Sequence, residues 1–196
     1  DMKNLVPDLA KNLLPYIDKD TIFWGHSWGG VVLYEVIKYL RINNFEKYKL
    51  IKQLMVTGSI APQLATPWKN RDSIKETANR HNSIDKIIST VSYIDDEKFL
   101  RKIIPIMKKD MATIMTYQYK HEEKLDIPIL AFGAKEDDVV LLSELSEWQK
   151  QTNDNFTLHA LHGDHWFLSR NKEFILAQMA ISIANILSPS KGLYNV

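Results

Sequence analysis

The sequence contains no cysteine among its 196 residues. This absence excludes disulfide bonds, thiolate zinc sites and any cysteine nucleophile, and it is typical of the reducing cytoplasm, where we expect the protein to act. The formal net charge is only +1. A charge this small indicates neither a nucleic acid nor an anionic membrane as a binding partner. The longest apolar stretch, residues 174–187, is too short to span a bilayer.

Glycine is also scarce, yet three of the seven glycines flank one serine in the segment TIFWGHSWGGVVLY. GHSWG matches the pattern G-x-S-x-G, in which a strand turns sharply into a helix and holds the serine at the turn. We expect strained backbone at Ser27 and, at Gly25 and Gly29, no room for a side chain. Gly30 should let the helix approach the sheet closely. A serine placed in a tight turn by chance is the alternative interpretation.

Helical and strand patterns alternate along the chain. The predicted helices cover residues 5–17, 29–42, 142–151 and 174–187, and the predicted strands cover residues 21–25, 50–58, 127–134 and 155–163. Alternation of this kind predicts an α/β fold, a mostly parallel sheet with helices on both faces, in one domain over residues 1–196.

The stretch from about residue 63 to 123 interrupts this alternation, because it contains no strand pattern. Two helical patterns fill it, at residues 71–94 and 95–121, and Pro105 should kink or divide the second. A helical insertion between two strands either covers the functional site as a lid or adds packing. We favour the lid, because binding segments commonly decorate a rigid α/β scaffold.

A nucleophilic serine requires a base, and the base requires an orienting acid. In the strand–turn–helix arrangement of this motif the acid and then the histidine follow the serine along the chain. The loop after the strand at 127–134 offers Asp137 and Asp138, with Glu136 as a weaker candidate. An aspartate in such a loop can also cap a turn. The residues alone do not choose between the two aspartates.

Three histidines, His159, His162 and His165, recur at intervals of three. On a strand, residues three apart face opposite sides, so His159 and His162 should diverge, and we expect no metal site. His165 follows Gly163 in the loop where a general base is expected, and His162 is its rival.

On these residues the chain resembles the type II thioesterases that serve nonribosomal peptide and polyketide synthases, members of the α/β-hydrolase superfamily. FWGHSWGGVVLYEV resembles the serine turn of that family, LMVTGSIAP its next strand, KKDMATIMTYQY part of its lid, ILAFGAKEDDVVLLSELSEW its acid loop and HGDHWFL its histidine segment. The resemblance extends from about residue 5 to 187. It implies Ser27 as nucleophile, Asp137 rather than Asp138 as acid, and His165 as base.

The resemblance also implies further roles around the serine. The backbone N–H of Trp28 would serve as an oxyanion donor, and we expect His26, Trp28 and Trp166 to contact the substrate. Trp28 replaces a smaller residue of the family, so it should narrow the acyl pocket or press on the lid. The family has strands before the segment that begins at Leu5, one loop of which supplies a second oxyanion donor. We expect that segment to be missing from this sequence.

The function implied by the resemblance is hydrolysis of acyl thioesters on the phosphopantetheine arm of acyl or peptidyl carrier proteins, which removes wrongly loaded groups. The activity should require no cofactor, and we expect a monomer. Two alternatives stay open: another serine esterase or lipase with the same three residues, and a non-catalytic module of hydrolase-like fold.

Overall fold

The computed structural model describes residues 1–65 and 96–187. Within these ranges one four-stranded sheet has the order β1-β2-β3-β4, and each neighbouring pair of strands is parallel. The strands are β1 (Thr21–His26), β2 (Ile51–Thr57), β3 (Ile129–Ala134) and β4 (Phe156–Leu161). The predicted parallel sheet is therefore confirmed, and each predicted strand is present within two residues of its expected ends.

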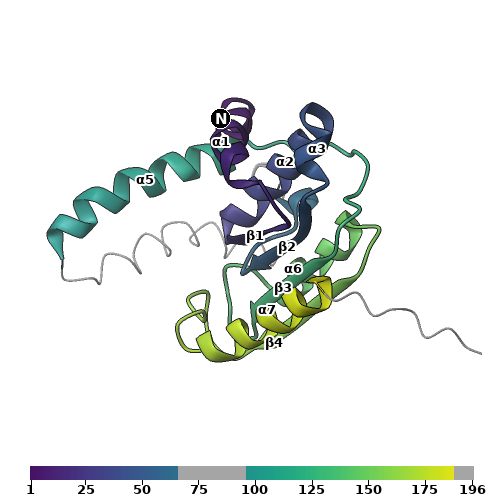
Figure 1. Ribbon diagram of the computed structural model, residues 1–196. Coiled ribbons are helices and arrows are strands. Elements are labelled where there is room, and N and C mark those ends of the chain that lie inside the picture. Colours follow the sequence, from purple (N-terminus) through teal and green to yellow (C-terminus); the bar gives the residue numbers. More distant parts are fainter. Residues whose placement is uncertain (66–95, 188–196) are drawn as a thin grey trace, which may run out of the picture.

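The sheet separates two apolar layers, because successive side chains of a strand point to opposite faces. Leu54 and Val56 pack with the layer of α1 (Met2–Leu13) and α2 (Trp28–Asn43). Met55, between them, packs on the other face against α7 (Lys172–Leu187). Figure 1 shows α1 and α2 on one side of the sheet and α7 on the other, so helices cover both faces as predicted.

The predicted helix over 142–151 is wrong in its second half. Residues Leu142–Ser146 form α6, but Glu147–Gln151 continue as a 3₁₀-helix, η5. Tertiary contacts explain the tighter winding, since Trp148 is fully buried and its Nε1 donates a hydrogen bond to the carbonyl oxygen of Ser59 at 2.7 Å. Shorter elements, α3 (Phe45–Tyr48), η1 (Leu14–Tyr16) and η2 (Pro62–Leu64), complete the described chain.

Helix α5 (Glu97–Thr116) is the longest element described within the predicted insertion. It begins where the Asp96 side chain accepts a hydrogen bond from the Phe99 N–H at 3.0 Å, a stabilising N-cap. It continues through Pro105 as one helix, so of the two expected effects the division is wrong and the kink stays a prediction. The first helical pattern of the insertion, residues 71–94, lies outside the described residues, and the lid remains a prediction.

Across the described ranges, no helix combines the length and the apolar character that a bilayer crossing requires.

Candidate active site

The turn from β1 to α2 holds Ser27 in a backbone conformation that few side-chain-bearing residues adopt. Its φ is +51°, which makes it the one non-glycine residue with positive φ in the described parts of the chain. A Cβ at Gly25 would lie 2.5 Å from the carbonyl carbon of Gly29, and one at Gly30 would overlap the Ser59 side chain. A Cβ at Gly29 would meet open space, so our expectation of a collision there is wrong.

Three side chains from the carboxyl edge of the sheet meet at this turn. Ser27 Oγ lies 3.1 Å from His165 Nε2, and His165 Nδ1 lies 2.9 Å from Asp137 Oδ2. Asp137 and His165 are only 3% and 4% exposed, so little water competes for these hydrogen bonds. The arrangement can withdraw the serine proton while the carboxylate fixes the imidazole tautomer, which is the requirement for an activated nucleophile.

The Asp137 carboxylate is held by backbone as well as by the histidine. Its Oδ1 accepts hydrogen bonds from the N–H groups of Val139 and Val140 at 2.8 and 2.9 Å, which leaves Oδ2 for His165. The aspartate therefore both stabilises its own turn and orients the imidazole. These are the two roles that the sequence left as alternatives, and one side chain performs both.

Two of the other candidates, Glu136 and His162, pair with each other. Glu136 Oε2 accepts a hydrogen bond from the Gly163 N–H at 2.5 Å, and its Oε1 lies 3.2 Å from His162 Nδ1. The bond from Gly163, followed by that from His162, lowers the pKa of the Glu136 carboxyl. Asp138 is exposed. The structure thus brings Asp137 and His165 to Ser27 and pairs Glu136 with His162 in the neighbouring loop.

The repeated histidines do not converge. The His159 ring stacks on Phe132, with centroids 5.2 Å apart, and meets Phe174 edge-on. Burial there lowers its pKa. In the described portion of the chain, no group of three or more acidic, cysteine or histidine side chains is arranged to bind a metal ion.

His26 forms a ring contact with His165 that the sequence did not predict. Its ring centroid lies 5.4 Å from that of His165, and its Nδ1 lies 3.1 Å from Thr57 Oγ1. The same hydroxyl accepts a hydrogen bond from Trp24 Nε1 at 3.2 Å. Burial, and then the proximity of His165, lowers the pKa of His26 to about 4. His26 is therefore a neutral neighbour of His165 at neutral pH.

Trp28 connects the serine turn to α5. As the first residue of α2, it has a backbone N–H with no acceptor inside the helix. Its indole Nε1 donates to Thr113 Oγ1 at 3.0 Å, and its ring meets Tyr117 edge-on at 5.3 Å. Trp28 thus contacts α5 within the predicted insertion, and its expected effect on an acyl pocket or a lid stays a prediction. Trp166, which is 42% exposed, lies edge-on to His165 at 5.9 Å.

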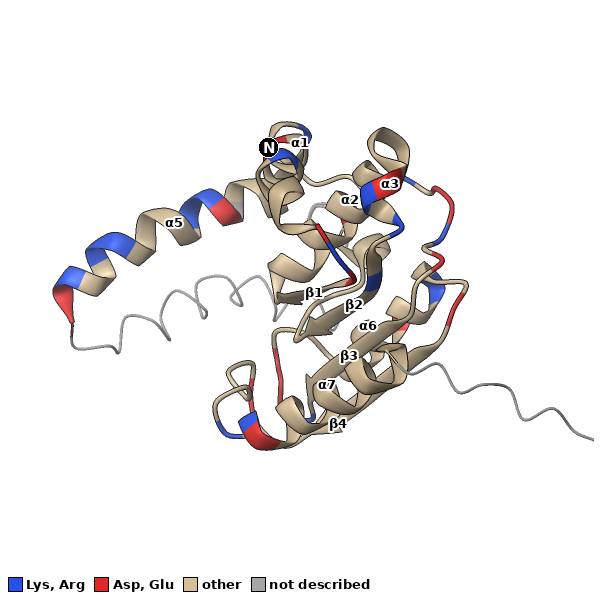
Figure 2. Cartoon of the chain, in the orientation of Figure 1, with Lys and Arg blue, Asp and Glu red and all other residues tan. Residues whose placement is uncertain are grey.

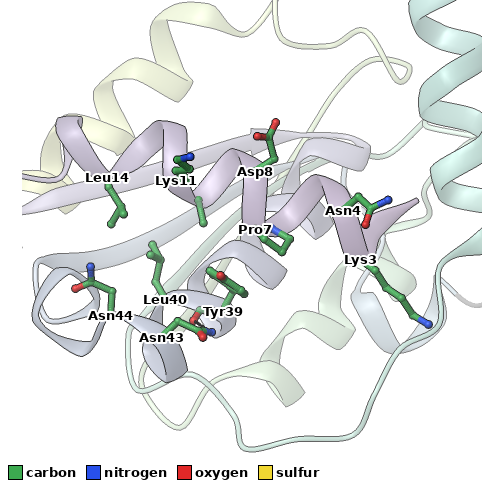
Figure 3. Close-up of a pocket in the computed structure, with 11 residues that line it drawn as sticks. Lys3, Asn4, Pro7, Asp8, Lys11, Leu14, Tyr39, Leu40, Asn43 and Asn44 are labelled. Atoms are coloured by element: carbon green, nitrogen blue, oxygen red, sulfur yellow. Dashed lines mark hydrogen bonds between the residues drawn. The ribbon is translucent and has the colours of Figure 1, made fainter.

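A cavity of about 550 Å³ lies elsewhere, between α1 and the end of α2 (Figure 3). Its lining includes Pro7, Leu14, Leu40, Asn43 and Asn44. None of the three residues of the hydrogen-bonded chain at the serine lines it. The cavity offers no nucleophile paired with a base, so we place the candidate site at the serine turn.

Comparison with known proteins assigns the chain to a family. Residues 1–181 match the family described as thioesterase domain. The chain is 26% identical over 200 residues to linear gramicidin dehydrogenase LgrE of Brevibacillus parabrevis, an alignment that covers 98% of the chain and 73% of the relative. It is also 26% identical to gramicidin S biosynthesis protein GrsT of Aneurinibacillus migulanus, over 96% of the chain and 73% of the relative.

Among solved structures, ClbQ from the colibactin NRPS/PKS pathway is similar with a TM-score of 0.77 at 20% identity, covering 97% of this chain and 80% of that one. This likeness supports the α/β-hydrolase fold. The word dehydrogenase in the name of LgrE has no counterpart in the motifs of this chain, since its seven glycines form no G-x-G-x-x-G dinucleotide pattern.

Proposed function

This chain belongs to the thioesterase domain family, and on that premise we propose that it hydrolyses acyl thioesters on the phosphopantetheine arm of acyl or peptidyl carrier proteins. The observation that carries the proposal is the hydrogen-bonded chain from Ser27 through His165 to Asp137. Thioester hydrolysis needs a nucleophile and a base but no redox group, and these three residues supply both.

The proposed reaction has two steps. Ser27 Oγ attacks the thioester carbonyl while His165 Nε2 takes its proton, and the proton then passes to the departing thiolate of the arm. Water next attacks the acyl-serine ester as His165 takes a proton from it and returns one to Ser27 Oγ. Asp137 keeps the imidazole in the required tautomer and stabilises its positive charge. The net change is thioester plus water to carboxylic acid plus thiol.

Negative charge develops on the carbonyl oxygen in both steps. We propose the Trp28 N–H as one donor to this oxygen, because it lies next to Ser27 at the amino end of α2 and has no acceptor within the helix. The positive end of the α2 dipole favours the same charge. Removing one donor of this kind typically lowers kcat about 10²–10³-fold.

The names of the relatives support the pathway. Two of them refer to gramicidin, and the structural neighbour ClbQ comes from an NRPS/PKS pathway. We therefore propose that the carrier proteins belong to a nonribosomal peptide or polyketide synthase, and that the enzyme clears groups that block the arm.

The test is release of thiol from acetyl-loaded carrier protein, measured for the wild-type enzyme and for Ser27→Ala. Ser169→Ala, an exposed serine on the loop after β4, is the matched control and should retain wild-type turnover. No thiol release above the Ser27→Ala background would refute the proposal.

An esterase or lipase with the same residues is separated by comparing matched oxygen esters and thioesters. The proposed function requires a higher kcat/KM for the carrier-bound thioester. A non-catalytic module is separated by a fluorophosphonate probe, which should label the wild-type protein at Ser27. Absence of labelling would favour the non-catalytic alternative.

A further inference from the structure

Helix α5 carries a concentration of positive charge that the proposed reaction does not use. The helix contains five basic and two acidic side chains, a net charge of +3, whereas the whole chain carries +1. Figure 2 shows these basic residues as blue bands along α5, which extends away from the sheet. The remainder of the sequence therefore has a slightly negative net charge, so the net positive charge of the chain is carried by this helix.

The basic side chains share one face of the helix. At 3.6 residues per turn they fall within an arc of about 120°, and each is exposed. We call them the basic stripe of α5: Lys98, Arg101, Lys102, Lys108 and Lys109. Within the stripe, Arg101 is paired with Glu97 at 2.8 Å. The half-buried apolar residues Leu100, Ile103, Met107 and Ile114 lie on the opposite face.

The stripe has a defined position relative to Ser27. At its carboxyl end α5 is fixed to α2 by the hydrogen bond from Trp28 to Thr113 and by the one from the Tyr117 hydroxyl to Glu35 Oε1, at 2.6 Å. A rise of 1.5 Å per residue places Lys109 about 6 Å and Lys98 about 22 Å along the axis from Thr113. The stripe therefore begins close to the serine turn and leads away from it.

We propose that the basic stripe of α5 is the docking surface for the carrier protein, which it binds through an anionic face around the attachment point of the phosphopantetheine arm. This inference rests on the proposed function. The arm is joined to its carrier through a phosphodiester, so the attachment point of every carrier bears a negative charge. Exposed lysines are suited to attract such a charge at long range and to release the carrier after turnover.

The arrangement of charge on α5 favours a protein partner over a lipid surface. A helix that lies on a membrane buries its apolar face in the bilayer and keeps its basic residues toward the headgroups. In α5 the apolar residues directly opposite the stripe are only partly exposed. Phe99, Ile106 and Met115, at the sides of the stripe, are exposed but do not form a continuous apolar face. Glu97 and Asp110 are exposed on the same helix and would oppose binding to anionic lipid.

The test compares two substrates that share one acyl group: a carrier-bound thioester and a free acyl-pantetheine thioester. The stripe variant carries Lys98→Glu, Lys102→Glu, Lys108→Glu and Lys109→Glu. The control variant changes Lys19, Lys49, Lys124 and Lys150 to Glu. These control lysines are exposed and each precedes a strand, at the opposite edge of the sheet from Ser27. Both variants therefore undergo the same change of net charge.

The measured quantity is the ratio of kcat/KM for carrier-bound to free substrate, which cancels losses of folded enzyme. We expect this ratio to fall about tenfold in the stripe variant, through KM, and to stay at the wild-type value in the control. With the wild-type enzyme, KM for the carrier substrate should rise with salt, because screening weakens exposed charges. This salt series supplies the test even if the stripe variant does not fold.

The outcomes separate the two proposals. If the wild-type enzyme hydrolyses the free thioester but not the carrier-bound one, the proposed function is wrong. The proposed docking surface is then wrong as well, because it rests on that function. If carrier turnover is normal but the stripe variant keeps its ratio, or the wild-type KM is insensitive to salt, the docking surface alone is wrong. Equal losses in both quadruple variants, or binding of anionic vesicles that depends on the stripe, would also overturn it.

Discussion

Replacing Asp137 by asparagine should disable the candidate site while leaving its geometry in place. The amide oxygen can take over the hydrogen bonds that Oδ1 accepts from Val139 and Val140. The amide nitrogen then faces His165 Nδ1, where the carboxylate accepts a hydrogen bond at 2.9 Å in the wild-type enzyme. Because that nitrogen can only donate, it favours the tautomer with the proton on Nε2. That proton points at Ser27, and the histidine can no longer act as its base.

The expected loss in kcat is about 10⁴-fold, the scale found when the orienting carboxylate of a serine–histidine–aspartate triad is replaced in this way. It corresponds to about 5.5 kcal/mol of transition-state stabilisation. KM should change little, because Asp137 is buried behind the histidine and does not face the substrate.

The assay is steady-state release of thiol from an acyl-pantetheine thioester, with thermal unfolding measured in parallel to confirm that the variants fold. Asp138→Asn, next along the same loop and exposed, is the matched control and should keep kcat within about twofold, as surface substitutions usually do. A folded Asp137→Asn enzyme that retains a tenth of wild-type kcat, or an equal loss in Asp138→Asn, would refute the reasoning.

Three further predictions concern the same region. Gly25→Ala should abolish turnover and lower the free energy of unfolding by about 1–3 kcal/mol, because its Cβ meets backbone at 2.5 Å; wild-type kcat would contradict this. Thr113→Val removes the bond to Trp28 and should cost about 1 kcal/mol of stability and change the acyl-chain preference, measured across acyl-pantetheines of increasing length. The pKa of His26, lowered to about 4, means that the unfolded chain binds more protons between about pH 4 and 6.5. Stability should therefore fall as the pH falls through that window, and urea unfolding of His26→Gln should show a shallower pH dependence than wild type.

Local patterns were sufficient to predict the framework around the serine. The strand TIFWG and the glycines that follow it determine a turn whose geometry depends on neighbours within a few residues. The parallel sheet followed from alternation of helix and strand, because such connections leave few topologies. The loops that hold Asp137 and His165 were also identifiable, since each follows a strand at the same edge of the sheet and so lies near Ser27.

Contacts between distant segments could not be predicted in this way. Nothing near residue 148 indicates that its indole donates to Ser59, 89 residues earlier, and this contact accompanies the change from α6 to the 3₁₀-helix η5. The residues alone also left Asp137 and Asp138 as alternatives, and only the family resemblance favoured Asp137. Both occupy the same loop, and only its folded path directs the first toward His165 and the second to the surface.

The contacts of Trp28 join the two proposals. We propose its backbone N–H as a donor to the reacting carbonyl, and its side chain donates a hydrogen bond to α5, the helix that carries the basic stripe. A carrier docked on the stripe would therefore act on a helix in direct contact with the residue beside Ser27. If docking shifts α5, the Trp28 indole must move or lose its hydrogen bond to Thr113. The side chains that contact the acyl group would then be arranged differently. Carrier-bound and free thioesters should then differ in acyl-length preference as well as in KM. Thr113→Val should abolish that difference in preference while leaving the salt dependence of KM intact.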